Sequence, residues 1–207
     1  MMNDFLIIGA GGHARTLIDS VLSSGQILSG LVDINYKKQK ENILGVRVLG
    51  GVEILNNFNP KKTSVILAIG DIKKREEWFL ELKERGFSFH SVIHSTAILS
   101  KYASVGEGVF IGSGAIVNAE AIIGDNVIVN TGVIVEHEVK IGKNCHLAPG
   151  VKIAGRVTVG SNTFIGIGSS VANNIAIGRD SIIGAGSVIV KNVKDSSKVV
   201  GVGRVLP

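Results

Sequence analysis

Two histidines in the second half of the chain have side chains and spacing suited to acid–base chemistry. His137 stands between two acidic residues in the run Glu136-His137-Glu138, and His146 follows nine residues later. An imidazole can act as a general base near neutral pH, and an adjacent carboxylate can orient it and raise its basicity. The alternative is that Glu138 belongs to a surface ion-pair ladder, which adds little stability by itself.

A repeat of six residues must position these side chains. Every sixth residue from Ile93 to Ile189 is Ile, Leu or Val, at 17 successive positions. A hexapeptide period is typical of a β-helix. Gly also recurs every 18 residues, at positions 106, 124, 142, 160 and 178 and at 114, 132, 150, 168 and 186. Three hexapeptides therefore form each coil of a triangular prism, whereas a β-sandwich of short strands has no reason to keep an 18-residue glycine register.

The 18-residue period places His137 and Glu138 on an exposed corner of this prism. One coil before and after His137 lie Ala119 and Gly155, two small residues that leave space for a ligand. Glu138 stacks in the same way between Glu120 and Arg156. His146 lies half a coil away from His137.

The first residues of the chain have a different pattern. Residues 5–8 form a buried strand, residues 9–14 (GAGGHA) a glycine turn, and the residues through Ser24 a helix. Gly9, Gly11 and Ala14 match the G-x-G-x-x-[GA] spacing, which brings a phosphate to a helix N-terminus. A second strand, residues 28–32, ends at Asp33, where an acid can meet a ribose or a base. We expect binding of a nucleotide joined to another group. NAD binding would need a second nucleotide half and a hydride-transfer site, and a purely structural turn is the remaining alternative.

Further elements complete a small open α/β unit. We expect an extended segment at residues 46–50, a short helix at 51–57, strands at 64–69 and 87–92, and a helix at 71–85. The predicted fold class is therefore α/β plus all-β. A Rossmann-like domain covers residues 1–90, a parallel β-helix of hexapeptide repeats covers 91–193, and a C-terminal tail covers 194–207.

Composition limits the classes of function. The net charge is +5, but no basic stripe with interleaved aromatic residues indicates nucleic-acid binding. Cys145 is the single cysteine and falls at an inward position, which predicts a packed thiol rather than a nucleophile. No apolar run approaches the length of a membrane span, and the N-terminal residues lack the basic region of a signal peptide. We expect a cytoplasmic protein without membrane insertion.

The whole chain resembles the bacterial sugar acetyltransferases of the PglD/NeuD type. The matching stretches are residues 7–14 (IIGAGGHA), 68–70 (AIG), 92–94 (VIH), 135–139 (VEHEV), 153–155 (IAG) and 191–193 (KNV). This resemblance implies a nucleotide-sugar-binding α/β domain followed by a left-handed β-helix. It also implies a homotrimer with active sites between subunits, and acetyl-CoA as the co-substrate.

The resemblance also implies roles for residues of the β-helix. His137 matches the general base, and Glu138 matches the acid that tunes it. His146 matches a residue beside the acetyl-CoA thioester, and the Gly155 amide would hold the thioester carbonyl. Ile167 and Ala185 match main-chain contacts along the pantetheine channel, with Ala185 standing in place of a family glycine.

In the α/β domain, the resemblance implies binding of the nucleotide sugar. Gly11, Gly12 and His13 match the diphosphate turn, Asp33 and Ile34 match the base-binding strand end, and Gly70 lines the same cleft. The C-terminal tail departs from the family, whose usual G-x-P-A-[KR] is replaced here by Gly-Val-Gly-Arg at residues 201–204.

These observations predict an N-acetyltransferase for surface-glycan or glycoprotein sugars. It would move acetyl from acetyl-CoA to the 4-amino group of a nucleotide-linked deoxy amino sugar, with UDP as the expected nucleotide. Sialic-acid-type O-acetylation, N-acetylation of GDP-perosamine and a non-catalytic nucleotide-binding scaffold remain alternatives. A zinc carbonic anhydrase site needs three converging histidines, and only His137 and His146 lie well inside the prism. We therefore expect no metal.

Overall fold

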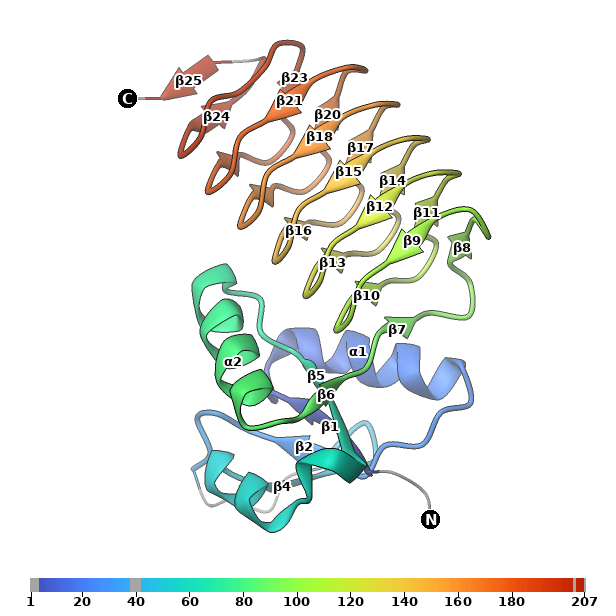
Figure 1. Ribbon diagram of the computed structural model, residues 1–207, viewed down its shortest axis with the longest axis vertical. Helices are drawn as coiled ribbons and strands as arrows, with labels where there is room; N and C mark the ends of the chain where they lie inside the picture. The colour runs from blue at the N-terminus through green and yellow to red at the C-terminus, as the bar shows by residue number, and fades with distance from the viewer. Residues whose placement is uncertain (1–3, 38–41, 203, 207) are drawn as a thin grey trace. The chain divides into compact units, whose positions relative to one another are not determined.

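The computed structural model describes residues 4–37, 42–202 and 204–206, and it divides into two compact units, Met1–Ser95 and Thr96–Pro207 (Figure 1). Gly203 and Pro207 of the predicted tail lie outside the described residues. No helix among the described residues has the length and hydrophobicity needed to cross a membrane.

The first unit is a mixed α/β sheet with helices. Its sheet has the strand order β3-β4-β2-β1-β5-β6, in which only β3 and β4 pair antiparallel. In chain order, the elements are β1 (Asp4–Ile8), α1 (Gly12–Ser23), β2 (Gly30–Val32), β3 (Asn42–Ile43), β4 (Val46–Gly50), η1 (Val52–Asn57), η2 (Pro60–Lys62), β5 (Thr63–Leu67), α2 (Ile72–Glu84), β6 (Ser88–Phe89) and β7 (Val92–Ile93). The central strand β1 has four consecutive buried residues, as expected for a parallel strand covered on both faces.

Most predicted elements of this unit are confirmed. Strands β2 and β5 are shorter than expected, and the short helix η2 was not predicted. The strand expected at residues 87–92 is divided into β6 and β7. Between them, the His90 ring packs edge-on against Phe5, with ring centroids 4.8 Å apart, and forms a hydrogen bond with Gln26. The two-residue strand β3 was not predicted, because a strand this short has no alternation to detect.

The second unit is a parallel β-helix, as the repeat predicted (Figure 1). Its strands form three sheets, and from β8 to β23 each pairing joins residues 18 apart. One sheet holds β8 (Ile98–Leu99), β11 (Ile116–Val117), β14 (Ile134–Val135), β17 (Lys152–Ile153), β20 (Ser170–Val171) and β23 (Val188–Ile189). Another holds β9 (Ser104–Val105), β12 (Ile122–Ile123), β15 (Lys140–Ile141), β18 (Thr158–Val159) and β21 (Ala176–Ile177). The last contains β10 (Phe110–Ile111), β13 (Ile128–Val129), β16 (His146–Leu147), β19 (Phe164–Ile165), β22 (Ile182–Ile183), β24 (Lys198–Val200) and the antiparallel β25 (Arg204–Leu206).

The interior of the β-helix changes character along its length. The early coils have apolar side chains between the strands, and Cys145 is fully buried there, with its thiol directed at the Gly160 carbonyl oxygen at 3.1 Å. The prediction of an inward, packed thiol is therefore confirmed. In later coils, Thr163 and Ser169 are also fully buried, and each hydroxyl donates to a backbone carbonyl 2.9 Å away. These bonds satisfy the polar groups that burial would otherwise penalise.

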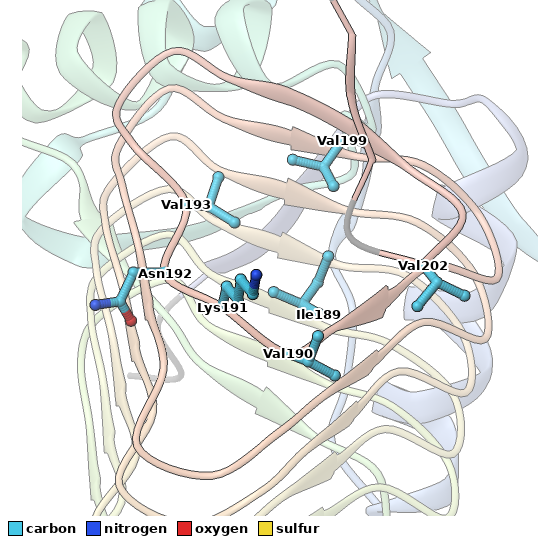
Figure 2. Close-up of a pocket in the computed structure, with 7 residues that line it drawn as sticks. All are labelled: Ile189, Val190, Lys191, Asn192, Val193, Val199 and Val202. Carbon is cyan, nitrogen blue, oxygen red and sulfur yellow. The ribbon is translucent and has the colours of Figure 1, made fainter.

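The last complete coil has a small pocket of about 230 Å³ (Figure 2). It is lined by Ile189, Val190, Lys191, Asn192, Val193, Val199 and Val202. The Asn192 side chain accepts a hydrogen bond from the Ala176 N–H at 2.8 Å, at a position where the next strand would otherwise provide the acceptor. Asn192 therefore helps to terminate the sheet that contains β21.

Candidate active site

Each coil has three corners, and each kind of corner contains a residue with positive φ. The glycine corner uses Gly114, Gly132, Gly150, Gly168 and Gly186. The Asn corner uses Gly108, Asn126, Asn144, Asn162 and Asp180. The His137 corner uses Glu120, Glu138, Arg156 and Asn174, with φ between 57° and 62°. Asn and Gly are common in this conformation, whereas Glu and Arg are not.

The structure brings His137 and Glu138 together as a dyad. The Nδ1 atom of His137 lies 3.0 Å from Oε2 of Glu138, and Nε of Arg156 donates to the same oxygen at 2.9 Å. Two hydrogen bonds hold the pKa of the Glu138 carboxyl below its ordinary value. The bond to His137 is the larger cause, and the bond to Arg156 is the second. An ionised carboxylate can only accept, so the neutral imidazole carries its proton on Nδ1 and leaves the Nε2 lone pair free.

Gly155 lies directly against the His137 ring. A Cβ atom added to Gly155 would lie 2.6 Å from both Cε1 and Nε2 of the imidazole. We expected the small residue to leave space for a ligand, but the imidazole itself occupies this space. Among the described residues, none accepts a hydrogen bond from the Gly155 N–H. A donor without a protein partner therefore lies next to a base.

The other residues predicted along the β-helix lie elsewhere on the prism. His146 is on β16, and its ring packs edge-on against Phe164 with centroids 5.2 Å apart. Ile167 is 57% exposed on the glycine corner, and Ala185 follows one coil later on the same corner. These residues and the His137 corner occupy different parts of a coil, so one chain alone does not gather them around His137.

The glycine turn of the first unit follows the carboxyl end of β1. Gly11 is the N-cap of α1, and Gly12 and His13 are its first residues. A Cβ on Gly9 would lie 2.9 Å from the Ala68 carbonyl oxygen, and its φ is +110°, so the fold itself requires this glycine. A Cβ on Gly11, Gly12 or Gly70 would meet no atom within 4 Å. The fold leaves open space at these three positions.

Asp33 and Ile34 line a pocket of about 450 Å³ at the ends of β2 and β4. One carboxylate oxygen of Asp33 accepts from the Asn35 N–H at 3.1 Å, which shapes the turn after β2. Sequence reasoning missed the other lining residues, Asn35, Tyr36, Lys37, Gly51, Val52 and Glu53. Only their proximity to the ends of neighbouring parallel strands, where α/β sheets bind ligands, could have indicated them.

Comparisons with known proteins match both units. The family of the PglD N-terminal domain matches residues 4–82. Bacterial transferase hexapeptide repeats match residues 120–155 and 156–191, and the hexapeptide repeat of succinyl-transferase matches 102–137. The crystal structure of PerB from Caulobacter crescentus, in complex with CoA and GDP-perosamine, is 35% identical, with a TM-score of 0.93. The likeness covers 100% of this chain and 99% of that chain.

The chain belongs to the PglD/PerB-type sugar acetyltransferases. The family and enzyme class predicted from sequence are therefore confirmed. The acetyltransferase domain of PglB from Neisseria gonorrhoeae, solved with acetyl coenzyme A, is 27% identical over 100% of both chains, with a TM-score of 0.91. WeeI from Acinetobacter baumannii AYE is 23% identical over 98% of this chain and 99% of that chain, and its TM-score of 0.90 shows the shared fold. A comparison with curated proteins found no match.

Proposed function

We propose that this acetyltransferase transfers an acetyl group from acetyl-CoA to the 4-amino group of a nucleotide-linked deoxy amino sugar. The observation that carries this proposal is the His137–Glu138 dyad next to the partnerless Gly155 N–H. Two relatives support the choice of ligands. PerB was solved with CoA and GDP-perosamine, and the PglB domain was solved with acetyl coenzyme A.

His137 acts as the general base in this proposal. Bound acetyl-CoA supplies an activated acetyl group as its thioester. Nε2 of His137 takes the proton from the sugar amine as the nitrogen attacks, and the Glu138 carboxylate stabilises the imidazolium that forms. The new N–C bond replaces the C–S bond of the thioester, and coenzyme A leaves as a thiol that takes up the proton held by His137. Cys145 is fully buried, which supports direct transfer without an acyl-enzyme.

The Gly155 N–H donates to the thioester oxygen, on which negative charge develops. One such donor typically contributes about 3 kcal/mol to transition-state stabilisation. His146, Ile167 and Ala185 hold the co-substrate. Because these residues and His137 lie on different sides of the prism, we propose a homotrimer whose active sites lie between neighbouring subunits.

The first unit binds the nucleotide. Gly11, Gly12 and His13 bind the diphosphate at the N-terminus of α1, where free N–H groups and the helix dipole favour an anion. The open space around Gly11, Gly12 and Gly70 supports a close approach of the ligand to the backbone. Asp33 and Ile34, in their pocket, bind the base.

UDP is the nucleotide that the family resemblance favours, and GDP is the second candidate. The likeness to PerB, which was solved with GDP-perosamine, favours GDP. An acceptor panel distinguishes the two: UDP- and GDP-linked 4-amino sugars and free sialic acid are tested with acetyl-CoA, and thiol release is measured. The proposal expects turnover with a nucleotide-linked amine. Turnover with sialic acid alone would replace it with O-acetylation, and failure to bind CoA would favour a non-catalytic scaffold.

A further inference from the structure

Arg156 contacts both members of the dyad. Its backbone N–H donates to the His137 carbonyl oxygen at 3.0 Å, as part of the regular stacking of coils. Its side-chain Nε donates to Oε2 of Glu138 at 2.9 Å. Arg156 therefore connects two groups to the following coil by hydrogen bonds: the backbone of His137 and the side chain of Glu138.

The carboxylate oxygen that Arg156 contacts is the one that faces His137. Oε2 of Glu138 accepts hydrogen bonds from both Nδ1 of His137 and Nε of Arg156. The side chain of Glu138 is 40% exposed, so an isolated His–Glu pair here would be weak and would sample several rotamers. The guanidinium restricts the carboxylate to one rotamer, and it also offsets part of the negative charge beside the ring.

We propose that Arg156 is a positioning residue of the acetyl-transfer site. It holds Glu138 against Nδ1 of His137, which keeps Nε2 available as the base. This inference rests on the proposed function, because it presumes that His137 accepts the proton.

Arg179 provides a matched control on the Asn corner. It is also an exposed arginine, and its Nε lies 3.4 Å from Oδ2 of Asp195 and 3.8 Å from Oδ2 of Asp180. Arg179→Gln removes the same charge and the same kind of ion pair, away from the His137 corner. Arg156→Lys keeps the charge of Arg156 but loses its planar guanidinium.

The experiment measures kcat and KM for wild type, Arg156→Gln, Arg156→Lys, Arg179→Gln and His137→Ala. We expect Arg156→Gln to lower kcat about tenfold with little change in KM, because Glu138 no longer holds the imidazole in place while the ligand-binding residues are unchanged. Arg156→Lys should lower kcat by less, and Arg179→Gln should match wild type. Kinetic constants of Arg156→Gln that equal those of Arg179→Gln overturn the inference while leaving the proposed function intact, provided that His137→Ala is inactive. An active His137→Ala enzyme instead overturns the proposed function, and the inference with it.

Discussion

The Asn corner and the His137 corner share one backbone conformation but use it differently. Both have residues with φ near +60° at 18-residue intervals. On the Asn corner, the side chains form a ladder in which Asn126 donates to Asn144 at 2.8 Å and Asn144 donates to Asn162 at 2.9 Å. On the His137 corner, Glu138 and Arg156 pair instead around a histidine and a glycine.

We propose that this difference separates a structural use of the same geometry from a chemical one. Asn tolerates the left-handed region, so the Asn corner gains a buried ladder at low conformational cost. Glu and Arg in the same region carry strain of about 1 kcal/mol or more each, and the side chains of Arg156 and Glu138 are 62% and 40% exposed. Conflict between local preference and observed conformation is expected at functional sites, where the surrounding structure maintains it.

The Asn ladder offers the largest expected effect on stability. Asn144→Ala removes the acceptor for Asn126 and the donor to Asn162 inside a column where Asn126 and Asn144 are 3% exposed. We expect a loss of about 2–4 kcal/mol in unfolding free energy, measured by denaturant unfolding. Asn174→Ala is the control, because Asn174 has a φ of 57° but is exposed, and it should cost about 1 kcal/mol. Equal losses in the two variants would mean that the ladder adds nothing.

On the His137 corner, the largest effect of a small substitution is on activity. Gly155→Ala places a methyl group 2.6 Å from the original position of the His137 ring, so the imidazole must move away from its Glu138 contact. We expect kcat/KM to fall about 10- to 100-fold, which corresponds to about 1.4–2.7 kcal/mol, with little change in melting temperature. A double-mutant cycle with His137→Ala checks the cause, since the methyl group should cost little once the ring is gone. An equal further loss in the His137→Ala background would contradict this explanation.

The smallest effect comes from exchanging residue types between corners. Glu120→Gly gives the His137 corner a glycine, the residue type found at every position of the glycine corner. Because glycine adopts positive φ without strain, we expect the folded protein to be stabilised by about 0.5–1 kcal/mol. Gly132→Ala is the reverse test, because its added Cβ meets no atom within 4 Å and only the φ of +64° opposes it. It should destabilise by a similar amount. Thermal unfolding measures both, and two changes of the same sign would show that φ does not set the cost.

Much of the β-helix could be predicted from sequence because its period reflects packing directly. The inward residue of each strand recurs every six positions, and the observed register of 18 follows from three strands per coil. The Asn corner was also predictable, since Asn and Gly have known turn preferences. The left-handed conformation of Glu138 and Arg156 was not, because their residue types disfavour it.

The site was less predictable than the fold because it depends on side-chain rotamers. The spacing predicted that Glu138 would lie beside His137 and Arg156, but not that one oxygen would accept from both. It predicted space at Gly155, but not that the imidazole would fill it. Tyr36 and Glu53 join Asp33 in one pocket, although Tyr36 follows β2, Glu53 lies in η1, and neither belongs to a motif.

We propose that the His137 corner carries out acetyl transfer, and the variant His137→Ala provides the test. Turnover with acetyl-CoA and the nucleotide-linked amino sugar selected by the acceptor panel is measured by thiol release for wild type and variant. We expect kcat to fall at least about 100-fold, with unchanged melting temperature and oligomeric state. A variant that folds normally and keeps near wild-type turnover would show that His137 is not the base.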